Sequence, residues 1–382
     1  MKKIITYILL IILTLVIIIS IVLKCTIQKK ETIIKEYIFN YNEKIYIKDL
    51  LNIESTKILN TQTLGNNKYT IETKDKNYII NYKVLDKEPP LIKGSNTITI
   101  KKGDNIDLVN KYLCGDNYDK RPNCYIEGEY DINKIGTYDL TYKAEDSSGN
   151  ISKKDIKLIV KDKLQTNQNT TKSKIYLKDI IKKHKTSSTM IGIDVSSWQG
   201  DIDYKKAKQD GVEFVMIRIG YGYNKNNEII YDSKFKNNIL KAKEAGLKIG
   251  IYFYSYAKSI EDSINQANWI INELNGQELD LPIAFDWENW NSFNSYNISF
   301  KDLNDIAYAF IDTINSKGYE GTLYSSAYYL ENIWYDFNKT WLAHYTTKTD
   351  YSKPYQMWQL SSVGVVNGIN GNVDINILYL NQ

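Results

Sequence analysis

The arrangement of apolar and polar positions divides this chain of 382 residues into three regions. Residues 4–23 form a run of twenty uncharged and mostly apolar residues. In residues 29–162, apolar and polar positions alternate in short runs rich in Ile, Thr and Tyr, and Asn, Asp and Gly separate these runs. Such a pattern is typical of β-strands joined by turns. From Ile191 onward, apolar strand-like runs alternate with amphipathic stretches, which predicts strands alternating with helices.

The first region is predicted to be a transmembrane signal anchor over residues 1–24. Its uncharged run is long enough to span a bilayer, lysines flank both ends, and no small-residue cleavage site follows. Cys25 suggests a lipoprotein instead, but Lys24 stands where a small residue is expected before a lipidated cysteine. The expected location is therefore the cell membrane, crossed once, with the rest of the chain extracytoplasmic in the zone of the cell wall.

The second region predicts two tandem all-β sandwich modules, because the strand pattern of its first half returns in its second half. We expect a degenerate module at 29–86 and a better-formed module at 87–162. The string G-T-Y-D-L-T-Y-K-A-E-D-S-S-G-N at 136–150 resembles the bacterial immunoglobulin-like domains of surface proteins, and this resemblance implies a spacer. Residues 163–189 are polar and predict a linker that contains a short helix near 175–183.

The third region, 190–382, predicts an α/β barrel that is TIM-like and incomplete at its end. Three amphipathic stretches end at Gly246, Gly276 and Gly318, as helices commonly do. Parallel strands that alternate with such helices bring their carboxyl ends to one mouth. Eight strand-like runs lie at 191–195, 214–219, 248–254, 282–286, 321–324, 340–344, 356–360 and 373–378.

Charge and tryptophan content change between the two halves of the chain. Residues 1–190 hold 33 Lys+Arg against 22 Asp+Glu, and residues 191–382 hold 16 against 23, which gives +11 and −7 within a net charge of +4. A basic first half suits an anionic membrane or wall surface, and it equally suits simple solubility. All seven tryptophans lie at or after Trp198. Nucleic acid is not an expected partner, because no basic and aromatic module of a known type is present.

The three cysteines suggest one disulfide. Cys114 and Cys124 lie inside the second sandwich module, where an extracytoplasmic location would let them close a loop. Two unpaired thiols are the alternative. If the pair belongs to a spacer, Cys114→Ser is expected to leave the activity of the third region intact.

The run from Leu281 to Glu288 carries the clearest chemical signal. Side chains alternate along a strand, so Asp286 and Glu288 point the same way near the carboxyl end of the run. Two carboxyl groups on one face are the minimum needed to cleave a glycosidic bond, since one protonates the leaving oxygen and the other supports the developing positive charge. Taken alone, the two acids fit equally well with a strand that simply ends in solvent.

Further acids and aromatic residues fall at the predicted strand ends. Asp194 belongs to the first strand and Asp374 to the last, so both are expected at the mouth. Flat aromatic faces beside carboxylates suit sugar rings, although ordinary packing explains any one aromatic residue as well. The candidate substrate-binding residues are Trp198, Tyr221, Tyr252, Tyr254, Trp287, Trp290 and Trp358.

Metal and serine-nucleophile chemistry are disfavoured. The only histidines are His184, in the predicted linker, and His344, and neither belongs to an H-E-x-x-H motif. No G-x-S-x-G elbow or dinucleotide fingerprint is present. We therefore expect no metal and no cofactor.

Residues 191–382 resemble the glycoside hydrolase family 25 lysozymes, the N-acetylmuramidases. The resemblance implies hydrolysis of the β-1,4 bond between N-acetylmuramic acid and N-acetylglucosamine in peptidoglycan. The motifs that carry it, in order, are G-I-D-V-S-S-W-Q-G at 192–200, F-V-M-I-R-I-G-Y-G at 214–222, A-G-L-K-I-G-I-Y-F-Y-S-Y at 245–256, P-I-A-F-D-W-E at 282–288, Y-Q-M-W-Q at 355–359 and V-D-I-N at 373–376.

The resemblance also implies roles for individual residues. Glu288 matches the general acid of the family, and Asp286 matches the second catalytic carboxylate, which is thought to orient the 2-acetamido group of the substrate. Asp194 and Asp374 match the remaining acids at the mouth. The expected protein is therefore a membrane-anchored muramidase whose partner is the peptidoglycan glycan strand. A phage lysin with a delayed-release anchor is one alternative, and a non-catalytic peptidoglycan-binding surface protein is another.

Overall fold

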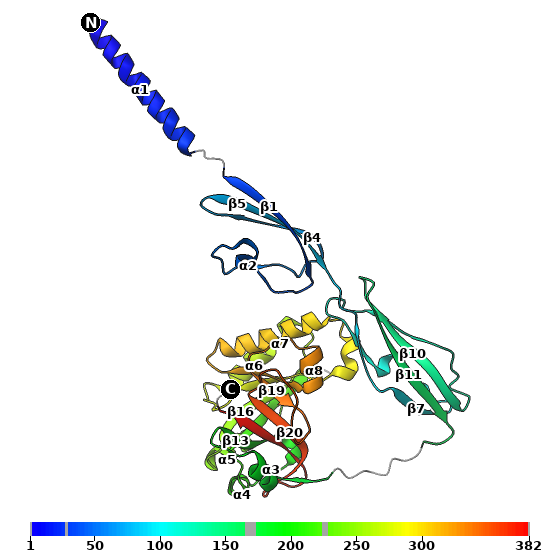
Figure 1. Cartoon of the computed structure of the whole chain (residues 1–382). Coiled ribbons are helices and arrows are strands. Elements are labelled where there is room, and N and C mark those ends of the chain that lie inside the picture. Colours follow the sequence, from blue (N-terminus) through cyan, green and yellow to red (C-terminus); the bar gives the residue numbers. More distant parts are fainter. Residues whose placement is uncertain (1, 27–29, 165–172, 224–227, 381–382) are drawn as a thin grey trace. The chain divides into compact units, whose positions relative to one another are not determined.

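The computed structural model describes the chain except for residues 1, 27–29, 165–172, 224–227 and 381–382 (Figure 1). The chain forms two compact units, Met1–Lys87 and Glu88–Gln382. Each unit is described by itself below.

The apolar run at the start of the first unit forms helix α1 (Lys2–Thr26). Across the part of the chain that the structure describes, no helix combines the length and the apolar character needed to cross a membrane. The transmembrane helix predicted for residues 1–24 is therefore wrong.

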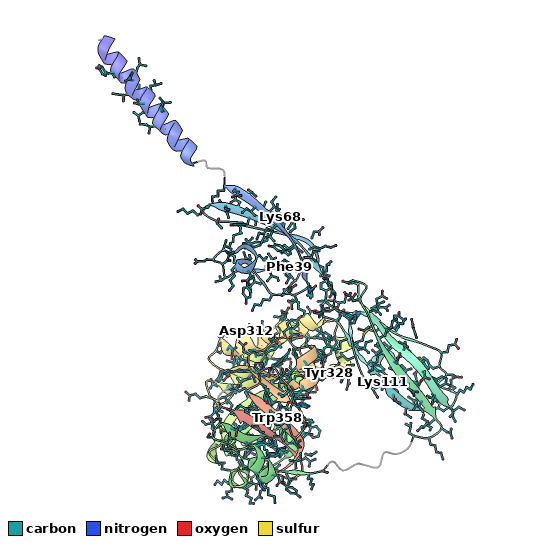
Figure 2. The ribbon with its side chains drawn as sticks, in the orientation of Figure 1. Phe39, Lys68, Lys111, Asp312, Tyr328 and Trp358 are labelled. Atoms are coloured by element: carbon teal, nitrogen blue, oxygen red, sulfur yellow. A yellow bond between two sulfur atoms is a disulfide. The ribbon has the colours of Figure 1, made fainter. Side chains whose placement is uncertain are left out.

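The rest of the first unit is a small mixed sheet with a short helix. Strands β1 (Glu31–Asn40), β5 (Lys76–Leu85) and β4 (Gly65–Glu72) lie in the order β1-β5-β4, with β1 parallel to β5. Strands β2 (Ile45–Tyr46) and β3 (Ile58–Leu59) pair beside helix α2 (Ile47–Leu51), which the alternating pattern did not predict. Phe39 of β1, labelled in Figure 2, Ile47 of α2 and Ile80 of β5 are all buried.

The second unit begins with a β-domain that has its own core. Strands β7 (Thr97–Lys101), β11 (Ile151–Lys161), β10 (Gly136–Glu145) and β9 (Asn123–Glu127) form one sheet, and β6 (Leu91–Lys93) pairs with β8 (Leu113–Gly115). The buried side chains of Leu140, Tyr142 and Leu158 form the centre of this core. A disulfide joins Cys114 of β8 to Cys124 of β9, as the sequence suggested.

The remainder of the second unit is a closed barrel of eight strands. Neighbouring strands around it are β13 (Thr189–Val195), β14 (Phe214–Tyr223), β16 (Lys248–Tyr254), β17 (Ile283–Asp286), β18 (Gly321–Ser326), β19 (Thr340–Ala343), β20 (Met357–Val365) and β21 (Val373–Tyr379). The helices between strands are α4 (Tyr204–Asp210), α5 (Phe235–Glu244), α6 (Ile260–Leu274), α7 (Phe300–Asn315) and α8 (Ala327–Asn332), and the short strand β15 (Ile229–Tyr231) pairs with β14.

The barrel closes differently from the predicted incomplete, TIM-like (β/α) barrel. Strand β21 runs antiparallel to both of its neighbours, β13 and β20, and completes the ring between them. Only residues 366–372 connect β20 to β21. A parallel crossover needs a dozen or more residues, so this short connection forces the last strand to return in the opposite direction. The predicted TIM-like closure is therefore wrong.

The second half of the predicted linker belongs to the barrel. Strand β12 (Ile175–Tyr176) pairs in parallel with β20, and helix α3 (Leu177–His184) follows it. Leu177 and Ile180 of this helix are buried in the same core as the barrel strands. Their spacing of three residues places both on one helix face, which is why the helix docks there.

Candidate active site

Three strands bring the four predicted acids to one mouth of the barrel. Asp286 ends strand β17 and Glu288 follows it, while Asp194 lies near the carboxyl end of β13. Asp374 is the second residue of β21 and pairs directly with Asp194. Because β21 is antiparallel to the other strands, its amino end lies where their carboxyl ends lie, and the four acids therefore share one site.

The mouth contains a polar cavity of about 310 Å³. All four acids line it, and so do four tyrosines and two tryptophans. The lining residues are Asp194, Ser196, Trp198, Gln199, Arg218, Tyr252, Tyr254, Asp286, Glu288, Tyr324, Trp341, Tyr345, Gln359 and Asp374.

Asp194 is fixed at the floor of this cavity by two amide groups. Its Oδ2 accepts hydrogen bonds from Gln359 Nε2 at 2.8 Å and from Asn376 Nδ2 at 2.7 Å. The amide oxygen of Gln359 in turn accepts from the hydroxyls of Tyr324 and Tyr345, each at 2.9 Å. Burial raises the pKa of the Asp194 carboxyl to about 6, although both amide hydrogen bonds oppose that rise. Asp194 is therefore a rigid acid that titrates close to neutrality.

The carboxyl pair of β17 holds protons more tightly than ordinary acids do. Burial raises the pKa of the Asp286 carboxyl well above its usual range, the charges of Glu288 and Asp194 raise it further, and Arg218 lowers it. Burial, followed by the charge of Asp194, also raises the pKa of the Glu288 carboxyl. Acids that share one face repel each other's charge, so the pair titrates as a unit rather than as two independent groups.

Solvent access distinguishes the two members of the pair. Asp286 is buried, and its Oδ1 has no hydrogen-bond partner among the described residues. The Glu288 side chain is exposed to solvent, even though the surrounding cavity wall removes enough water to raise its pKa. The geometry therefore gives Glu288 access to an incoming substrate and leaves Asp286 at the floor.

Asp374 adds a third acid with a displaced titration. Burial raises the pKa of its carboxyl to about 8, with smaller contributions from the charges of Asp194 and Glu288. Arg218 is the cation of the site, and Asp232 holds it through Nε at 2.9 Å and Nη2 at 2.8 Å. Since this arginine is already paired, it offsets the acidic cluster only in part.

Comparison with known proteins shows what the barrel and the Ig-like domain are similar to. Residues 193–369 match the model of the glycosyl hydrolases family 25, and residues 90–160 match the bacterial surface protein Ig-like domain. The barrel contains the whole segment that matches family 25, and it is called the family 25 domain below. The matched segment contains three of the four acids at the mouth, and Asp374 lies just beyond it.

Individual relatives of the family 25 domain include two curated lysozymes. The chain is 32% identical over 195 residues to the autolytic lysozyme of Clostridium acetobutylicum, which covers 49% of this chain and 55% of the relative. It is 25% identical over 209 residues to lysozyme M1 of Streptomyces globisporus, which covers 50% and 68%. The chain thus spans about half the length of the Clostridium lysozyme.

A solved structure of the modular autolysin LytC from Streptococcus pneumoniae, in complex with a synthetic peptidoglycan ligand, is also similar. Sequence identity is 25%, the TM-score is 0.46, and the match covers 63% of this chain and 56% of LytC.

The family 25 domain places the predicted aromatic residues in two groups. Trp198, Tyr252 and Tyr254 line the cavity, and Trp198 is 85% exposed at its rim. Four others do not line it. Tyr221 lies against the Arg218 guanidinium, 5.3 Å from the ring centroid, and the tryptophans at 287, 290 and 358 are buried in the barrel core.

Strand geometry explains why Trp287 and Trp358 are in the core. Trp287 stands between Asp286 and Glu288, so the alternation that turns both acids into the mouth turns the tryptophan away from it. Trp358, labelled in Figure 2, immediately precedes the mouth residue Gln359 and points outward for the same reason.

Several residues of the cavity were not predicted from the sequence. Tyr324 and Asp286 are paired across β18 and β17, and Asp286 and Tyr254 across β17 and β16, so register brings them together. The signal for Tyr324 was its position in a strand next to β17, but an aromatic residue in an apolar strand resembles a core residue. The cavity residues missed were Ser196, Gln199, Arg218, Tyr324, Trp341, Tyr345 and Gln359.

In a second, larger cavity on the family 25 domain, lysines hold two of the three lining acids in their charged form. It measures about 690 Å³, and Asp201 and Asp203 are among its lining residues. Hydrogen bonds from Lys234 lower the pKa of the Asp201 carboxyl, and those from Lys206 lower that of Asp203. A carboxylate with a lowered pKa is a poor proton donor, so the smaller cavity is the better candidate for acid catalysis.

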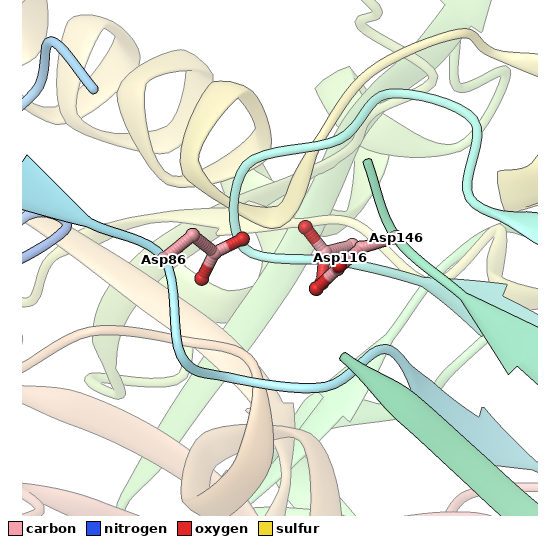
Figure 3. A group of neighbouring side chains, drawn as sticks. All are labelled: Asp86, Asp116 and Asp146. Carbon is pink, nitrogen blue, oxygen red and sulfur yellow. The ribbon is translucent and has the colours of Figure 1, made fainter. Parts of the chain in front are cut away.

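Two carboxylates outside the barrel also lie close together. Figure 3 shows Asp116 and Asp146 of the Ig-like domain, and carboxylate oxygens of the two lie within 4.8 Å of each other. Asp116 accepts the backbone N–H groups of Tyr118 and Asp119, and Asp146 accepts from the backbone and side chain of Asn150. These bonds tie both aspartates into the turns that they begin.

Proposed function

We propose that the family 25 domain hydrolyses the β-1,4 bond between N-acetylmuramic acid and N-acetylglucosamine in peptidoglycan. The observation that carries this proposal is the carboxyl pair of Asp286 and Glu288, which lies at the carboxyl end of β17 in a polar cavity and has raised pKa values. A general acid must still hold its proton near neutral pH, and this environment supplies that property. The similarity to curated lysozymes supports the choice of substrate.

In this proposal Glu288 protonates the glycosidic oxygen as the bond to the anomeric carbon breaks. It is chosen over Asp286 because its side chain reaches solvent and hence the leaving group. The buried Asp286 stays at the floor, where its unpartnered Oδ1 faces the reacting sugar and orients its 2-acetamido group as positive charge develops. Glu288 then acts as the base that takes a proton from the attacking water, which returns the site to its starting state.

The remaining acids and aromatic residues bind and position the glycan. Asp194 and Asp374 stand opposite each other beside the catalytic pair and accept sugar hydroxyls. Trp198 offers an exposed flat ring at the rim, on which the apolar face of a sugar packs.

We place the site of action outside the cytoplasm, in the zone of the cell wall. The disulfide between Cys114 and Cys124 supports this location, since disulfides persist in oxidising compartments and are rare in the cytosol. Peptidoglycan, the proposed substrate, lies in the same zone.

Digestion of purified peptidoglycan with the full chain tests the proposal. After borohydride reduction, mass spectrometry should find new reduced N-acetylmuramic acid ends. In the Glu288→Gln variant we expect turnover to fall by roughly 10²–10⁴-fold, while co-sedimentation with the wall stays unchanged. Reduced N-acetylglucosamine ends would show that the enzyme cleaves a different bond from the one proposed. Turnover close to wild type in the variant would show that Glu288 is not the general acid.

A non-catalytic wall-binding protein is the alternative from another class. The presence of all four acids in one cavity argues against it, because binding alone does not need a carboxyl pair with raised pKa values. Wild-type protein that sediments with the wall and yields no new ends would establish this alternative.

A further inference from the structure

The Ig-like domain contacts the barrel at the segment that directly follows Glu288. This segment is a 3₁₀ helix, η3 (Trp290–Ser295), and strand β8 lies beside it. Asn294 of η3 both accepts a hydrogen bond from β8 and donates one to Tyr112, just before that strand. Its Oδ1 accepts from Cys114 N at 3.0 Å, and its Nδ2 donates to Tyr112 O at 3.0 Å. One side chain thus satisfies two backbone groups of the other domain, as a paired strand would.

The residues that directly follow β8 bond to the start of helix α7. The first two N–H groups of a helix have no partner within the helix. In α7 these belong to Phe300 and Lys301, and they donate to the carbonyl oxygens of Asp116 and Asn117, at 2.7 and 3.4 Å. The carbonyls of the Ig-like domain therefore satisfy donors that the barrel leaves open.

Close packing accompanies these hydrogen bonds. A Cβ added at Gly115 would lie 2.6 Å from the Phe300 ring and 2.7 Å from the Phe293 ring, so only glycine fits this contact. Leu113 of β8 is buried in the core of the barrel rather than in that of its own domain. At the edge, Lys93 Nζ lies 3.5 Å from the ring centroid of Tyr328, which is labelled in Figure 2.

Aromatic contacts lead from this interface to the catalytic pair. The Phe293 and Trp290 rings meet Trp287 edge-on, with centroids 6.2 and 4.8 Å away. Trp287 stands between Asp286 and Glu288, and its Nε1 donates to Ala257 O at 3.0 Å. The backbone N–H of Trp290 donates to Glu288 O at 2.8 Å. The first turn of η3 therefore holds the backbone of the proposed acid directly.

We propose that the Ig-like domain is a part of the catalytic unit, and that its strand β8 positions Glu288 through Asn294 and η3. This inference rests on the proposed function, because it concerns the placement of the proposed acid. Asn294 is a positioning residue, since it acts through η3 and does not line the cavity. The domain is thus more than the spacer that its sequence implied.

Asn294→Ala in the full chain tests this inference. The variant removes both hydrogen bonds that Asn294 makes to the Ig-like domain and substitutes no residue that lines the cavity. A loosened η3 moves Glu288 and admits water beside it, so we expect kcat to fall roughly tenfold with KM within about twofold. The alkaline pKa in the pH profile of kcat, above which Glu288 loses the proton that it donates, should also move down toward that of an ordinary glutamate, because water restores the charged form. A merely structural role would not move that pKa.

Two further variants keep the test decisive. Asn294→Asp retains an acceptor for Cys114 N but cannot donate to Tyr112 O, so it should fold well and lose less activity than the alanine variant. Asn315→Ala is the matched control, because Asn315 Oδ1 also accepts a backbone N–H, that of Gly321, but it does so at the far end of α7. We expect wild-type kcat and pH profile from this control.

Three outcomes separate the possibilities. Reduced kcat and a shifted profile in the Asn294 variants alone support the inference. Wild-type kcat and profile in both of them, at a temperature where they remain folded, overturn it while the proposed function stands. Wild-type protein that yields no new reducing ends overturns the proposed function itself, before any variant is compared.

Discussion

Asp194 and Asp374 face each other directly across the antiparallel strands β13 and β21. Their carboxyl groups have pKa values raised to about 6 and about 8, and burial is the main cause in both. The last strand of the barrel therefore returns an acid to the mouth beside the acid of the first strand. The raised pKa values of both carboxyl groups therefore depend on the antiparallel pairing that closes the barrel.

Stability should fall as pH rises through the neutral range. An unfolded aspartate ionises near pH 3.8, whereas folded Asp374 keeps its proton up to about pH 8. Between these values the folded state binds more protons than the unfolded state, so the free energy of unfolding decreases with pH. Asp374→Asn should flatten this decrease by on the order of 1 kcal/mol, after allowance for water at the mouth.

Urea unfolding of wild type and Asp374→Asn at pH 5, 6, 7 and 8 measures this effect. Equal slopes against pH for the two proteins would show that the raised pKa of Asp374 is not linked to folding. The acids with lowered pKa values, such as Asp201, complete their contribution near pH 4 and do not interfere in this window.

Removal of the Gln359 amide should make Asp194 a weaker acid. Gln359 Nε2 stabilises the charged form of Asp194 through one hydrogen bond, so Gln359→Leu should raise its pKa above about 6. We expect kcat/KM at pH 7 to fall by roughly tenfold and the acidic side of the pH profile to move upward. The pH dependence of kcat/KM is the measurement, and a profile superimposable on that of wild type would contradict the role of the amide.

Loss of the exposed ring at the rim should weaken glycan binding without affecting the chemical step. In Trp198→Ala we expect KM for soluble glycan fragments to rise roughly tenfold, with kcat within about twofold. Tyr176→Ala provides the control, because Tyr176 is also an exposed aromatic residue of this unit but does not line the cavity. A fall in kcat with unchanged KM would instead place Trp198 in the chemical step.

Reduction of the disulfide should destabilise the Ig-like domain. The bond between Cys114 and Cys124 closes a short loop, so its loss should cost roughly 2–3 kcal/mol of unfolding free energy. Because Cys114 N donates to Asn294, we also expect reduced protein to show the same direction of change in kcat as the Asn294 variants. Activity assays and urea titrations with and without reductant measure both effects. Identical activity before and after complete reduction would separate the disulfide from catalysis, as expected for a spacer.

The sequence predicted those parts of the fold that local periodicity determines. Runs at 248–254 and 282–286 became β16 and β17 almost residue for residue, and helices ended near their predicted glycines. Asp286 and Glu288 were placed correctly in the mouth because strand alternation is strict. The same rule turns Trp287 away from the mouth, so strand alternation already argues against Trp287 as a substrate-binding residue.

Other features depend on contacts between distant segments. The antiparallel direction of β21 follows from a connection that is too short for a parallel crossover. The apolar and polar pattern of a strand does not show whether it runs parallel or antiparallel to its neighbours. Tyr324 enters the site only through its register with Asp286. Nothing distinguishes Asn294 from the many other asparagines of the chain until β8 lies beside it.

The carbonyls of Asp116 and Asn117 that receive the first amides of α7 also bear on how this unit melts. A β-domain that unfolded first would expose donors at the start of a barrel helix and withdraw Leu113 from the barrel core. Neither part can therefore lose its order without a cost to the other. In a calorimeter, residues 88–382 should absorb heat in one cooperative transition, although their two parts match two separate family models.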